Sequence, residues 1–288
     1  MDISGLKAFV AVAERGSFST AAESLFLTQP AVSKRISMLE QELGNRLFDR
    51  IGRTARLTQA GQTLLVRANR ILQELAVAER EVRDLSDTVG GTLNIATSHH
   101  IGLHRLPPVL RQFTDSYPEV RLNIDFTDSE KAHDTVLQGN IELAVITLAL
   151  DESPAIEAIT LWDDPLCFVA GHEHPLVGQA TVTLKELAAC ENVLPGLDTY
   201  TGQIVQRLFE KKRLRPDTLM ATNYLETIKM MVHVGIGWSV LPETMLDDSL
   251  VALPVEGAQL SRQLGYIVHR NHSRSNAARA FIDLLASL

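Results

Sequence analysis

Apolar residues repeat with a helical period near the start of the chain. The segment 4–14 has apolar side chains at positions i, i+3, i+4 and i+7, namely Leu6, Phe9, Val10 and Ala13. This spacing is typical of an amphipathic helix. Thr20 and Glu23 have the spacing of a capping box, which predicts a second helix from about residue 20 to residue 25.

A third helix is predicted over 28–43. Thr28 can cap it, Pro30 is tolerated in its first turn, and Gly44 is a common residue just past a helix end. Two short helices joined by a few residues match a helix-turn-helix, in which the second helix enters the major groove of DNA. Gln and Ser side chains near its start can contact base edges, and Lys and Arg can contact phosphates or guanine.

The segment 46–58 predicts a small β-hairpin, or wing, with Gly52 at its turn. The hairpin would bring Arg50, Arg53 and Arg56 close together. Residues 28–60 contain six basic and three acidic side chains. The alternative is a solvated basic face on an ordinary helical domain, because basic patches are common.

A longer helix is predicted from Thr58 to about residue 88. Its apolar positions are spaced alternately by four and three residues: Leu64, Ala68, Ile71, Leu75, Ala78, Val82 and Leu85. This heptad seam indicates pairing with a second copy of the chain, and a dimer would present two recognition helices to two half-sites of DNA. The alternative is that the seam packs on its own chain.

From Thr92 onward, strand-like and helical segments alternate, which favours an α/β fold with largely parallel sheets. Strands are expected at 92–97, 120–126, 141–147, 156–161, 166–170, 192–194, 219–221, 238–241 and 265–269. Helices are expected at about 104–116, 129–138, 183–189, 201–212, 224–234 and 275–286.

Net charge differs between the two parts of the chain. The whole chain carries −8, but residues 1–90 carry 12 basic and 11 acidic side chains, whereas the rest carries 15 and 24. This division suits a DNA-binding module joined to a domain with another role. No apolar run approaches the roughly 18 residues of a membrane span, and a signal-peptide pattern is absent. We therefore expect a cytoplasmic protein.

The stretch from Phe18 to Gly61 closely resembles the N-terminal signature of the LysR-type transcriptional regulators. The matching elements are Ala21-Ala22, Leu25, Thr28-Gln29-Pro30-Ala31-Val32-Ser33, Ile36, Leu39-Glu40, Leu43-Gly44, Leu47-Phe48, Arg50, Arg53 and Leu57-Thr58-x-Ala60-Gly61. The resemblance implies that Gln29, Pro30 and Ser33 face bases, that Thr28 and Lys34 contact the DNA backbone, and that Arg53 reaches toward the minor groove. The expected DNA-binding residues are Thr28, Gln29, Pro30, Ser33, Lys34, Arg35, Arg50, Arg53 and Thr54. Ala21, Ala22, Leu25, Val32, Ile36 and Leu39 are expected in the core.

The second part resembles the effector domain of the same family, which has a two-lobed fold like that of type II periplasmic binding proteins. The segments GTLNIATS (91–98), GNIELAVI (139–146) and VGIGWSVLP (234–242) carry this resemblance. The expected organisation is a winged helix-turn-helix at 1–58, a linker and dimerisation helix at 59–90, and an effector-binding domain at 91–288. Lobe one would comprise about 91–162 and 268–288, and lobe two about 163–267.

Ligands of open α/β sheets bind at the carboxyl ends of strands, near helix N-termini. Hydroxyl and backbone N–H groups at those positions favour a small anion, and the expected ligand-binding residues are Ser98, His99, His100, Thr147, Thr199, Thr201 and Asn223. The alternative is that the Ser and Thr residues cap helices. These loops contain no arginine, and Arg105 is the nearest, which argues against a permanently charged clamp for the anion.

Other classes of function have weaker support. Typical zinc spacings such as CxxC and HExxH are absent despite several histidines, and we expect no metal and no cofactor besides a small-molecule effector. A switch through oxidation of Cys167 or Cys190, or through histidine protonation, is an alternative. The motifs of nucleotide-binding loops and hydrolase triads are absent, so an enzyme is not expected. A solute-binding protein would need export. The expected partners are double-stranded DNA with an interrupted palindrome, the effector, a second copy in a homodimer or homotetramer, and RNA polymerase if the regulator activates.

Overall fold

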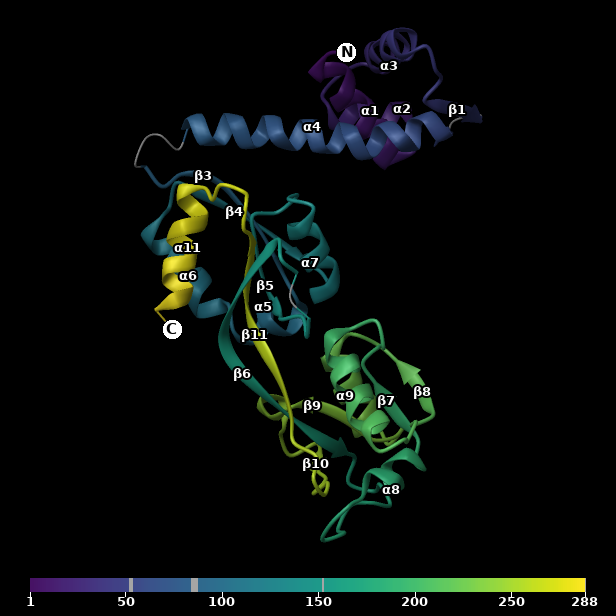
Figure 1. Cartoon of the computed structure of the whole chain (residues 1–288), viewed down its shortest axis with the longest axis vertical. Helices are drawn as coiled ribbons and strands as arrows, with labels where there is room; N and C mark the ends of the chain where they lie inside the picture. Colours follow the sequence, from purple (N-terminus) through teal and green to yellow (C-terminus); the bar gives the residue numbers. More distant parts are fainter. Residues whose placement is uncertain (52–53, 84–87, 152, 288) are drawn as a thin grey trace. The chain divides into compact units, whose positions relative to one another are not determined.

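The computed structural model describes residues 1–51, 54–83, 88–151 and 153–287. The chain divides into two compact units, Met1–Ser86 and Asp87–Leu288 (Figure 1). Each unit has its own hydrophobic core. After the roles that the sequence predicts for them, we call the first the DNA-binding unit and the second the effector unit. None of the described helices is long and apolar enough to cross a membrane.

The DNA-binding unit contains three short helices, a hairpin and one long helix. These are α1 (Ile3–Arg15), α2 (Phe18–Ser24), α3 (Gln29–Leu43), β1 (Phe48–Ile51), β2 (Thr54–Leu57) and α4 (Gln59–Arg83). The predicted end of α3 is confirmed, because Gly44 adopts a left-handed φ of 65° that glycine tolerates without steric cost. Strands β1 and β2 pair antiparallel as the expected wing. Thr58 caps α4, since its hydroxyl accepts a hydrogen bond from the Gly61 N–H at 3.0 Å.

The start predicted for the second helix was wrong by two residues. Helix α2 begins at Phe18, with Ser17 at the N-cap position, and the Thr20 hydroxyl donates to the Ser17 carbonyl instead of capping the helix. The ring of Phe18 packs edge-on against Phe48, with centroids 5.7 Å apart. Tertiary packing of an aromatic residue thus prevails over the local capping signal.

The core of the DNA-binding unit includes the residues expected there. Ala21, Ala22, Val32, Ile36 and Leu39 are buried, and Leu25 packs against them half-buried. Ala68 of α4 is also completely buried in this core, and Leu64 packs against it. At these two positions the heptad seam packs on its own unit, as the alternative interpretation held. Leu85 lies outside the described residues.

The effector unit alternates strands and helices. Its elements are β3 (Gly91–Thr97), α5 (His99–His104), α6 (Pro107–Ser116), β4 (Val120–Phe126), α7 (Ser129–Leu137), β5 (Leu143–Thr147), β6 (Ile156–Ala170), α8 (Leu184–Ala188), β7 (Asn192–Leu194), α9 (Tyr200–Lys211), β8 (Thr218–Ala221), α10 (Leu225–His233), β9 (Ser239–Pro242), η1 (Glu243–Met245), β10 (Val251–Ala252), β11 (Leu260–His269) and α11 (Asn276–Ala286). The sequence did not predict α5 as a separate helix, nor strand β10.

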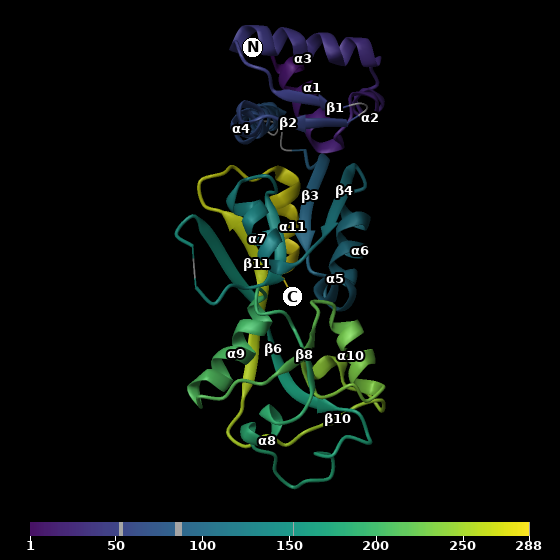
Figure 2. The same cartoon turned by 90° about the vertical axis from the view of Figure 1, so that its right-hand side faces the viewer.

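One sheet connects two lobes of the effector unit. Its strand order is β10-β6-β11-β5-β3-β4, with β9 beside β6, while β7 and β8 form a separate parallel pair. The antiparallel strands β6 and β11 run lengthwise through both lobes (Figures 1 and 2). Separate apolar clusters fill the lobes, one around Phe113 and Phe281 and one around Phe209 and Trp238. This is the expected two-lobed α/β fold, but the prediction of largely parallel sheets was wrong, because the crossover strands β6 and β11 pair antiparallel with each other and with all their other neighbours.

The crossover strand differs from the prediction. The sequence predicted two strands at 156–161 and 166–170, whereas β6 is continuous from Ile156 to Ala170. The polar segment between them keeps its pairing with β11, and the register shifts at Leu264/Gly265. A Cβ atom at Gly265 would lie 2.0 Å from the Ile159 carbonyl oxygen, so glycine is needed for the close approach.

Candidate functional site

Helix α3 presents a polar face to solvent. Thr28, Gln29, Pro30 and Lys34 are exposed, and Ser33 is half-buried. The helix turns by about 100° per residue, which places Pro30 and Lys34 opposite its buried face, whose members are Val32, Ile36 and Leu39. Gln29 is exposed because it lies in the first turn, and Ser33 borders the buried face. Side chains that can accept or donate hydrogen bonds therefore lie together on the exposed face near the start of a helix, as major-groove recognition requires.

Arg35 lies on a different side of α3. It lines a hollow with Asp2 and Gly5 at the start of α1 and with Glu42 of α3. The pKa of Asp2 is lowered, chiefly by the hydrogen bond from the Gly5 N–H, with a smaller contribution from the positive charge of Arg35. The structure thus separates Arg35 from Gln29 and Ser33, with which the sequence grouped it.

The wing is described in part. Arg56 lies opposite Asp49, and Arg50 lies opposite Ala55 in the ladder of β1 and β2. Thr54 is exposed at the start of β2. The predicted minor-groove residue Arg53 lies outside the described residues, and so does the side chain of Arg50.

Phe26 is a feature of the DNA-binding unit that the sequence reasoning missed. It lies in the turn between α2 and α3, its side chain is 97 % exposed, and its φ is 55°. Non-glycine residues are uncommon in this left-handed region. A large apolar ring therefore stands in solvent directly before α3, at a strained backbone position.

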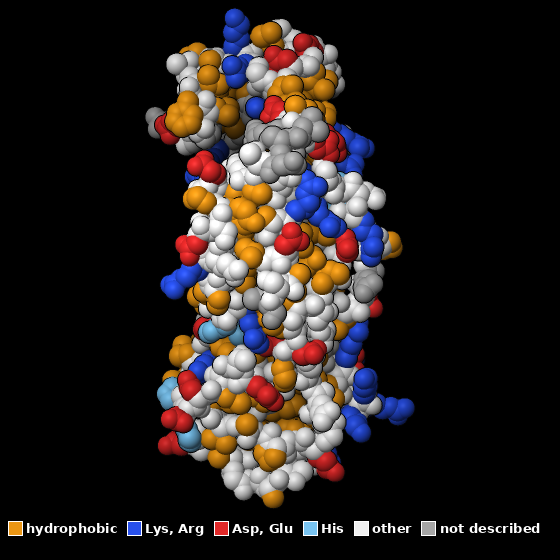
Figure 3. Space-filling model, turned by 90° about the vertical axis from the view of Figure 1, so that its left-hand side faces the viewer, with side chains coloured by type: hydrophobic (Ala, Val, Ile, Leu, Met, Phe, Trp, Pro, Cys, Tyr) orange, Lys and Arg blue, Asp and Glu red, His pale blue; other side chains and the backbone are white. Residues whose placement is uncertain are grey.

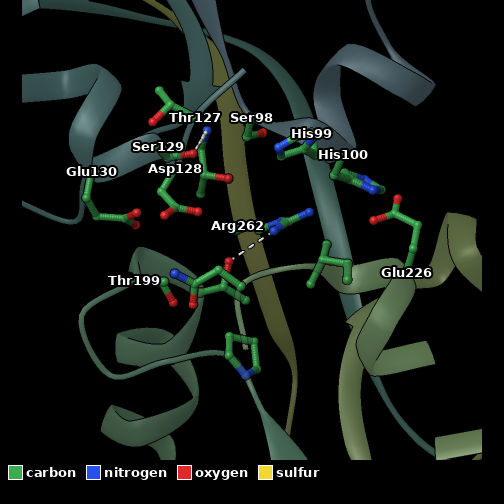
Figure 4. Close-up of a pocket in the computed structure, with 15 residues that line it drawn as sticks. Ser98, His99, His100, Thr127, Asp128, Ser129, Glu130, Thr199, Glu226 and Arg262 are labelled. Atoms are coloured by element: carbon green, nitrogen blue, oxygen red, sulfur yellow. Dashed lines mark hydrogen bonds between the residues drawn. The ribbon is translucent and has the colours of Figure 1, made fainter. Parts of the chain in front are cut away.

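A cavity of about 50 Å³ lies between the lobes of the effector unit (Figure 4). All seven predicted ligand residues line it: Ser98, His99, His100, Thr147, Thr199, Thr201 and Asn223. They come from the ends of β3 and β5, from α5 and α9, and from the loop before α10. Since a water needs about 10–15 Å³, the closed cleft has room for a few waters or for the polar group of a small ligand.

Several of these polar groups already have partners in the protein. The Thr199 hydroxyl donates to the Gly196 carbonyl and accepts from the Gly202 N–H at 3.0 Å, so it caps α9 as the alternative interpretation held. The Asn223 side-chain oxygen accepts a hydrogen bond from the Gly196 N–H at 3.3 Å. The ring of His99 stacks on Phe126, with centroids 5.5 Å apart. Thr199 and Asn223 thus shape the pocket as well as line it.

The sequence expectation that the pocket lacks an arginine was wrong. Arg262 reaches the pocket from β11, 5 % exposed, and donates from Nε to Asp164 at 2.8 Å and from Nη1 to the Thr201 hydroxyl at 3.0 Å. Its Nη2 has no hydrogen-bond partner among the described residues. The loops that carry the predicted ligand residues contain no arginine, as the sequence shows, whereas Arg262 belongs to the crossover strand β11, where no loop motif marks it.

Two acidic side chains line the pocket on the side opposite Arg262. Asp128 and Glu130 lie at the start of α7, on either side of Ser129. The Glu130 carboxylate accepts a hydrogen bond from the Tyr200 N–H at the start of α9. Burial raises the pKa of Glu130, and the hydrogen bond from Tyr200 opposes that rise. This bond joins lobe one to lobe two across the cleft.

His100 is buried at the edge of the pocket, 4 % exposed. Burial lowers its pKa to about 4, and the nearby charge of Arg262 lowers it further. The imidazole is therefore neutral at pH 7. Neither ring nitrogen has a hydrogen-bond partner among the described residues.

The two thiols pack against different apolar clusters. Cys167 on β6 packs beside Val169 and Leu241, and its pKa rises to about 11 because of burial. Cys190 packs against the cluster around Trp238.

On the face that Figure 3 shows, acidic and basic side chains are interspersed, so the negative charge of the effector unit is not gathered there into one patch.

Comparison with known proteins extends to both units. Residues 3–62 match the family model "Bacterial regulatory helix-turn-helix protein, lysR family", and residues 86–288 match "LysR substrate binding domain". The chain is 32 % identical over 290 residues to the RuBisCO operon transcriptional regulator of Allochromatium vinosum, covering 98 % of this chain and 94 % of that protein.

Solved structures share the fold. Full-length CbnR complexed with its target DNA has a TM-score of 0.71 at 22 % identity and covers 100 % of this chain and 99 % of that one. The effector-binding domain of QuiR in complex with shikimate has a TM-score of 0.62 at 19 % identity and covers 68 % of this chain and 95 % of that one. The chain belongs to the LysR family of transcriptional regulators, with a DNA-binding helix-turn-helix and an effector-binding domain.

Proposed function

We propose that this regulator responds to a small anion held in the cleft between the lobes, with Arg262 as its main charged contact. The observation that carries this proposal is the buried guanidinium whose Nη2 has no hydrogen-bond partner in the part of the chain that the structure describes. Buried charged donors are usually fully hydrogen-bonded, so a ligand oxygen would complete the set. The QuiR domain, which has the same fold, binds shikimate, a small carboxylic acid.

The acidic side of the pocket narrows the class of ligand. Asp128 and Glu130 face the cleft opposite Arg262, so a ligand with an ammonium group as well as a carboxylate would match both sides. Binding would change the separation of the lobes, and this change would alter DNA binding through a coupling free energy between the two sites. The regulator would act on DNA in the bacterial cytoplasm.

Thermal unfolding of the full chain tests this proposal. Both tryptophans, Trp162 and Trp238, lie in the effector unit, so their fluorescence reports on that unit. A ligand that binds the folded state raises its stability by RT ln(1 + [L]/Kd). We expect a shift with one class among simple carboxylates, amino acids and inorganic oxyanions, and the loss of that shift in Thr201→Val or Ser98→Ala.

Thr114→Val serves as the matched control, because Thr114 is exposed on α6 and does not line the pocket. Its shift should equal that of the wild type. If every anion in the panel fails to stabilise the wild type, or if Thr201→Val keeps the full shift, the anion site is refuted.

We further propose that the exposed part of α4 pairs with α4 of a second copy. Ile71 and Val82 are 40 % and 71 % exposed, although both are apolar seam positions. Leu75→Asp should dissociate the dimer, because it places a charge in an apolar seam. Val66→Asp, at an exposed position outside the seam, should leave it intact. Sedimentation velocity distinguishes monomer from dimer in each variant, and a dimer that survives Leu75→Asp would contradict the pairing of α4 helices.

A further inference from the structure

Two histidines and a glutamate meet where the lobes approach each other beside the anion pocket. His100 and His104 lie on α5 of lobe one, and Glu226 lies on α10 of lobe two. Each offers one metal-ligating atom, and these atoms all lie within 4.8 Å of one another. The spacing of four residues places both histidines on one face of α5. The Glu226 side chain extends from α10 toward His100 (Figure 4).

The hydrogen bonds of the protein leave this cluster incomplete. His100 is 4 % exposed, and both of its ring nitrogens lack a partner among the described residues. The rings of His100 and His104 have centroids 4.8 Å apart. The remaining contact, from His104 Nε2 to Glu226 Oε1, is long at 3.4 Å. A buried polar side chain without partners requires an explanation, and a bound ion is one of the common explanations.

We propose that His100, His104 and Glu226 bind a divalent transition-metal cation of the zinc type. Two imidazoles and one carboxylate suit such cations, whereas Mg²⁺ and Ca²⁺ prefer oxygen ligands. Three protein ligands leave a coordination position for water. The negative charge of Glu226 offsets part of the ion's charge, and Asp164 pairs with Arg262, the cation that faces His100 from β11.

The geometry links such a metal to closure of the cleft. Ligand atoms around a tetrahedral zinc lie about 3.3–3.6 Å apart, as bonds of about 2.0–2.2 Å dictate. His104 Nε2 and Glu226 Oε1, which belong to different lobes, are already 3.4 Å apart, and all three ligand atoms lie within 4.8 Å of one another, so one ion could bridge α5 and α10. The ion would therefore hold the two lobes together. His100 and Glu226 also line the anion pocket, so the two sites are neighbours, but metal binding and anion binding are measured separately and either can fail without the other.

Part of this metal site is visible in the sequence. His100 and His104 have a helical metal-binding spacing, but Glu226 lies 122 residues beyond His104. Because α5 was not predicted as a separate helix, the spacing could not be placed on a helix face. The expectation of no metal rested on the absence of short zinc motifs, which do not cover a site shared between two lobes.

Titration of the metal-free full chain with Co²⁺ and Zn²⁺ tests the site. Co²⁺ gives a visible absorption that reports tetrahedral nitrogen and oxygen ligands, and calorimetry measures the stoichiometry for Zn²⁺. The wild type should bind one cation per chain at this site. His104→Gln and Glu226→Gln change exposed side chains, so both proteins should fold, and each should weaken binding by at least about tenfold.

His272→Gln is the matched control. His269 and His272 form a second pair, with ring centroids 4.1 Å apart, that could hold a cation loosely. This variant should bind Co²⁺ with the affinity of the wild type. Three outcomes would overturn the proposal: no saturable binding by the wild type, unchanged affinity in both His104→Gln and Glu226→Gln, or loss of binding in His272→Gln.

Discussion

The two units of this regulator place their functional side chains in opposite environments. In the DNA-binding unit the candidate side chains on α3 are exposed and close in sequence, from Thr28 to Lys34. In the effector unit they are largely buried and come from segments as far apart as Ser98 and Arg262. DNA is a large surface that approaches an exposed helix, whereas a small ligand must be enclosed. Changes at the first site should therefore alter binding alone, and changes at the second should alter stability as well.

The largest effect is expected from Arg262→Leu. This change leaves Asp164 buried and without its main partner, which typically costs about 3–5 kcal/mol of unfolding free energy. Arg105, 3.4 Å from Asp164, should offset part of the loss. The loss of unfolding free energy is measured by urea unfolding of the full chain, with tryptophan fluorescence as the readout.

The double variant Arg262→Leu/Asp164→Leu provides the control. Removing both charges should restore most of the lost stability, because an apolar pair leaves no unpaired charge buried. If Arg262→Leu were as stable as the wild type, the contrast between a buried and an exposed functional site would fail.

The second effect concerns a half-buried thiol, that of Cys167, which we expect to be unreactive. Thiolate is the reactive form of cysteine, and burial raises the pKa of Cys167 to about 11 from an ordinary value of 9.0. At pH 8 the thiolate fraction should therefore be roughly 100-fold lower than that of a free cysteine, since each pKa unit is a factor of ten. The alkylation rate should rise tenfold per pH unit until it levels off near pH 11.

A Cys190→Ser background isolates Cys167 in this measurement, with iodoacetamide as the reagent and mass spectrometry as the readout. A rate near that of free cysteine at pH 8 would favour the alternative in which thiol oxidation switches the regulator. It would also show that burial in the effector unit does not suppress reactivity.

The contrast between the units also explains how much the sequence could predict. The C-terminal end of α3 follows from a local signal, Gly44, and the buried face of α3 follows from its periodicity. Thr28 stands at the N-cap position as predicted, but its side chain makes no capping hydrogen bond. The strands of the wing pair as predicted, and its predicted turn residue Gly52 lies outside the described residues. The seven polar residues gathered in the cleft could be predicted because they follow the carboxyl ends of strands, β3 and β5 in one lobe and β7 and β8 in the other, and these ends open onto the same cleft.

Other features depend on contacts that the sequence does not encode locally. Arg262 reaches the pocket from the middle of a long crossover strand, and its partner Asp164 precedes it by 98 residues. Arg35 carries a positive charge near the start of α3, as a DNA contact would, but it lines a hollow with Asp2, because α1 packs on that side of α3. Phe18 extends α2 through a contact with Phe48. In each case tertiary packing decides the outcome.

The third effect should be confined to recognition of DNA. Gln29→Ala and Ser33→Ala remove side chains that can contact base edges, which are worth about 1–3 kcal/mol of discrimination for a good pair of contacts. We expect the preference for selected over unrelated DNA to fall by about tenfold. The measurement uses DNA selected from a random pool by the wild type and unrelated DNA of equal length at the same salt concentration.

Arg35→Ala on the same helix is the control, because Arg35 faces Asp2. It should leave the preference unchanged. A loss of preference in Arg35→Ala with none in Gln29→Ala would reverse the assignment of faces on α3. Unfolding free energies of Gln29→Ala should stay near that of the wild type, in contrast to Arg262→Leu.

The smallest effect should come from Phe26→Asn, which tests whether exposure in the DNA-binding unit carries a cost. The Phe26 ring is 97 % exposed, so little apolar burial is lost when it is replaced. Its φ of 55° lies in a region that Asn tolerates better than Phe. We expect a gain of about 0.5–1 kcal/mol in the stability of this unit, measured by hydrogen exchange of α2 and α3 amides. Ser24→Asn, at an exposed position with ordinary φ, should show no such gain. If Phe26→Asn stabilises the unit yet weakens DNA binding, the exposed ring at this strained backbone position serves recognition. The DNA-binding unit, like the effector unit, would then give up some local stability for its function.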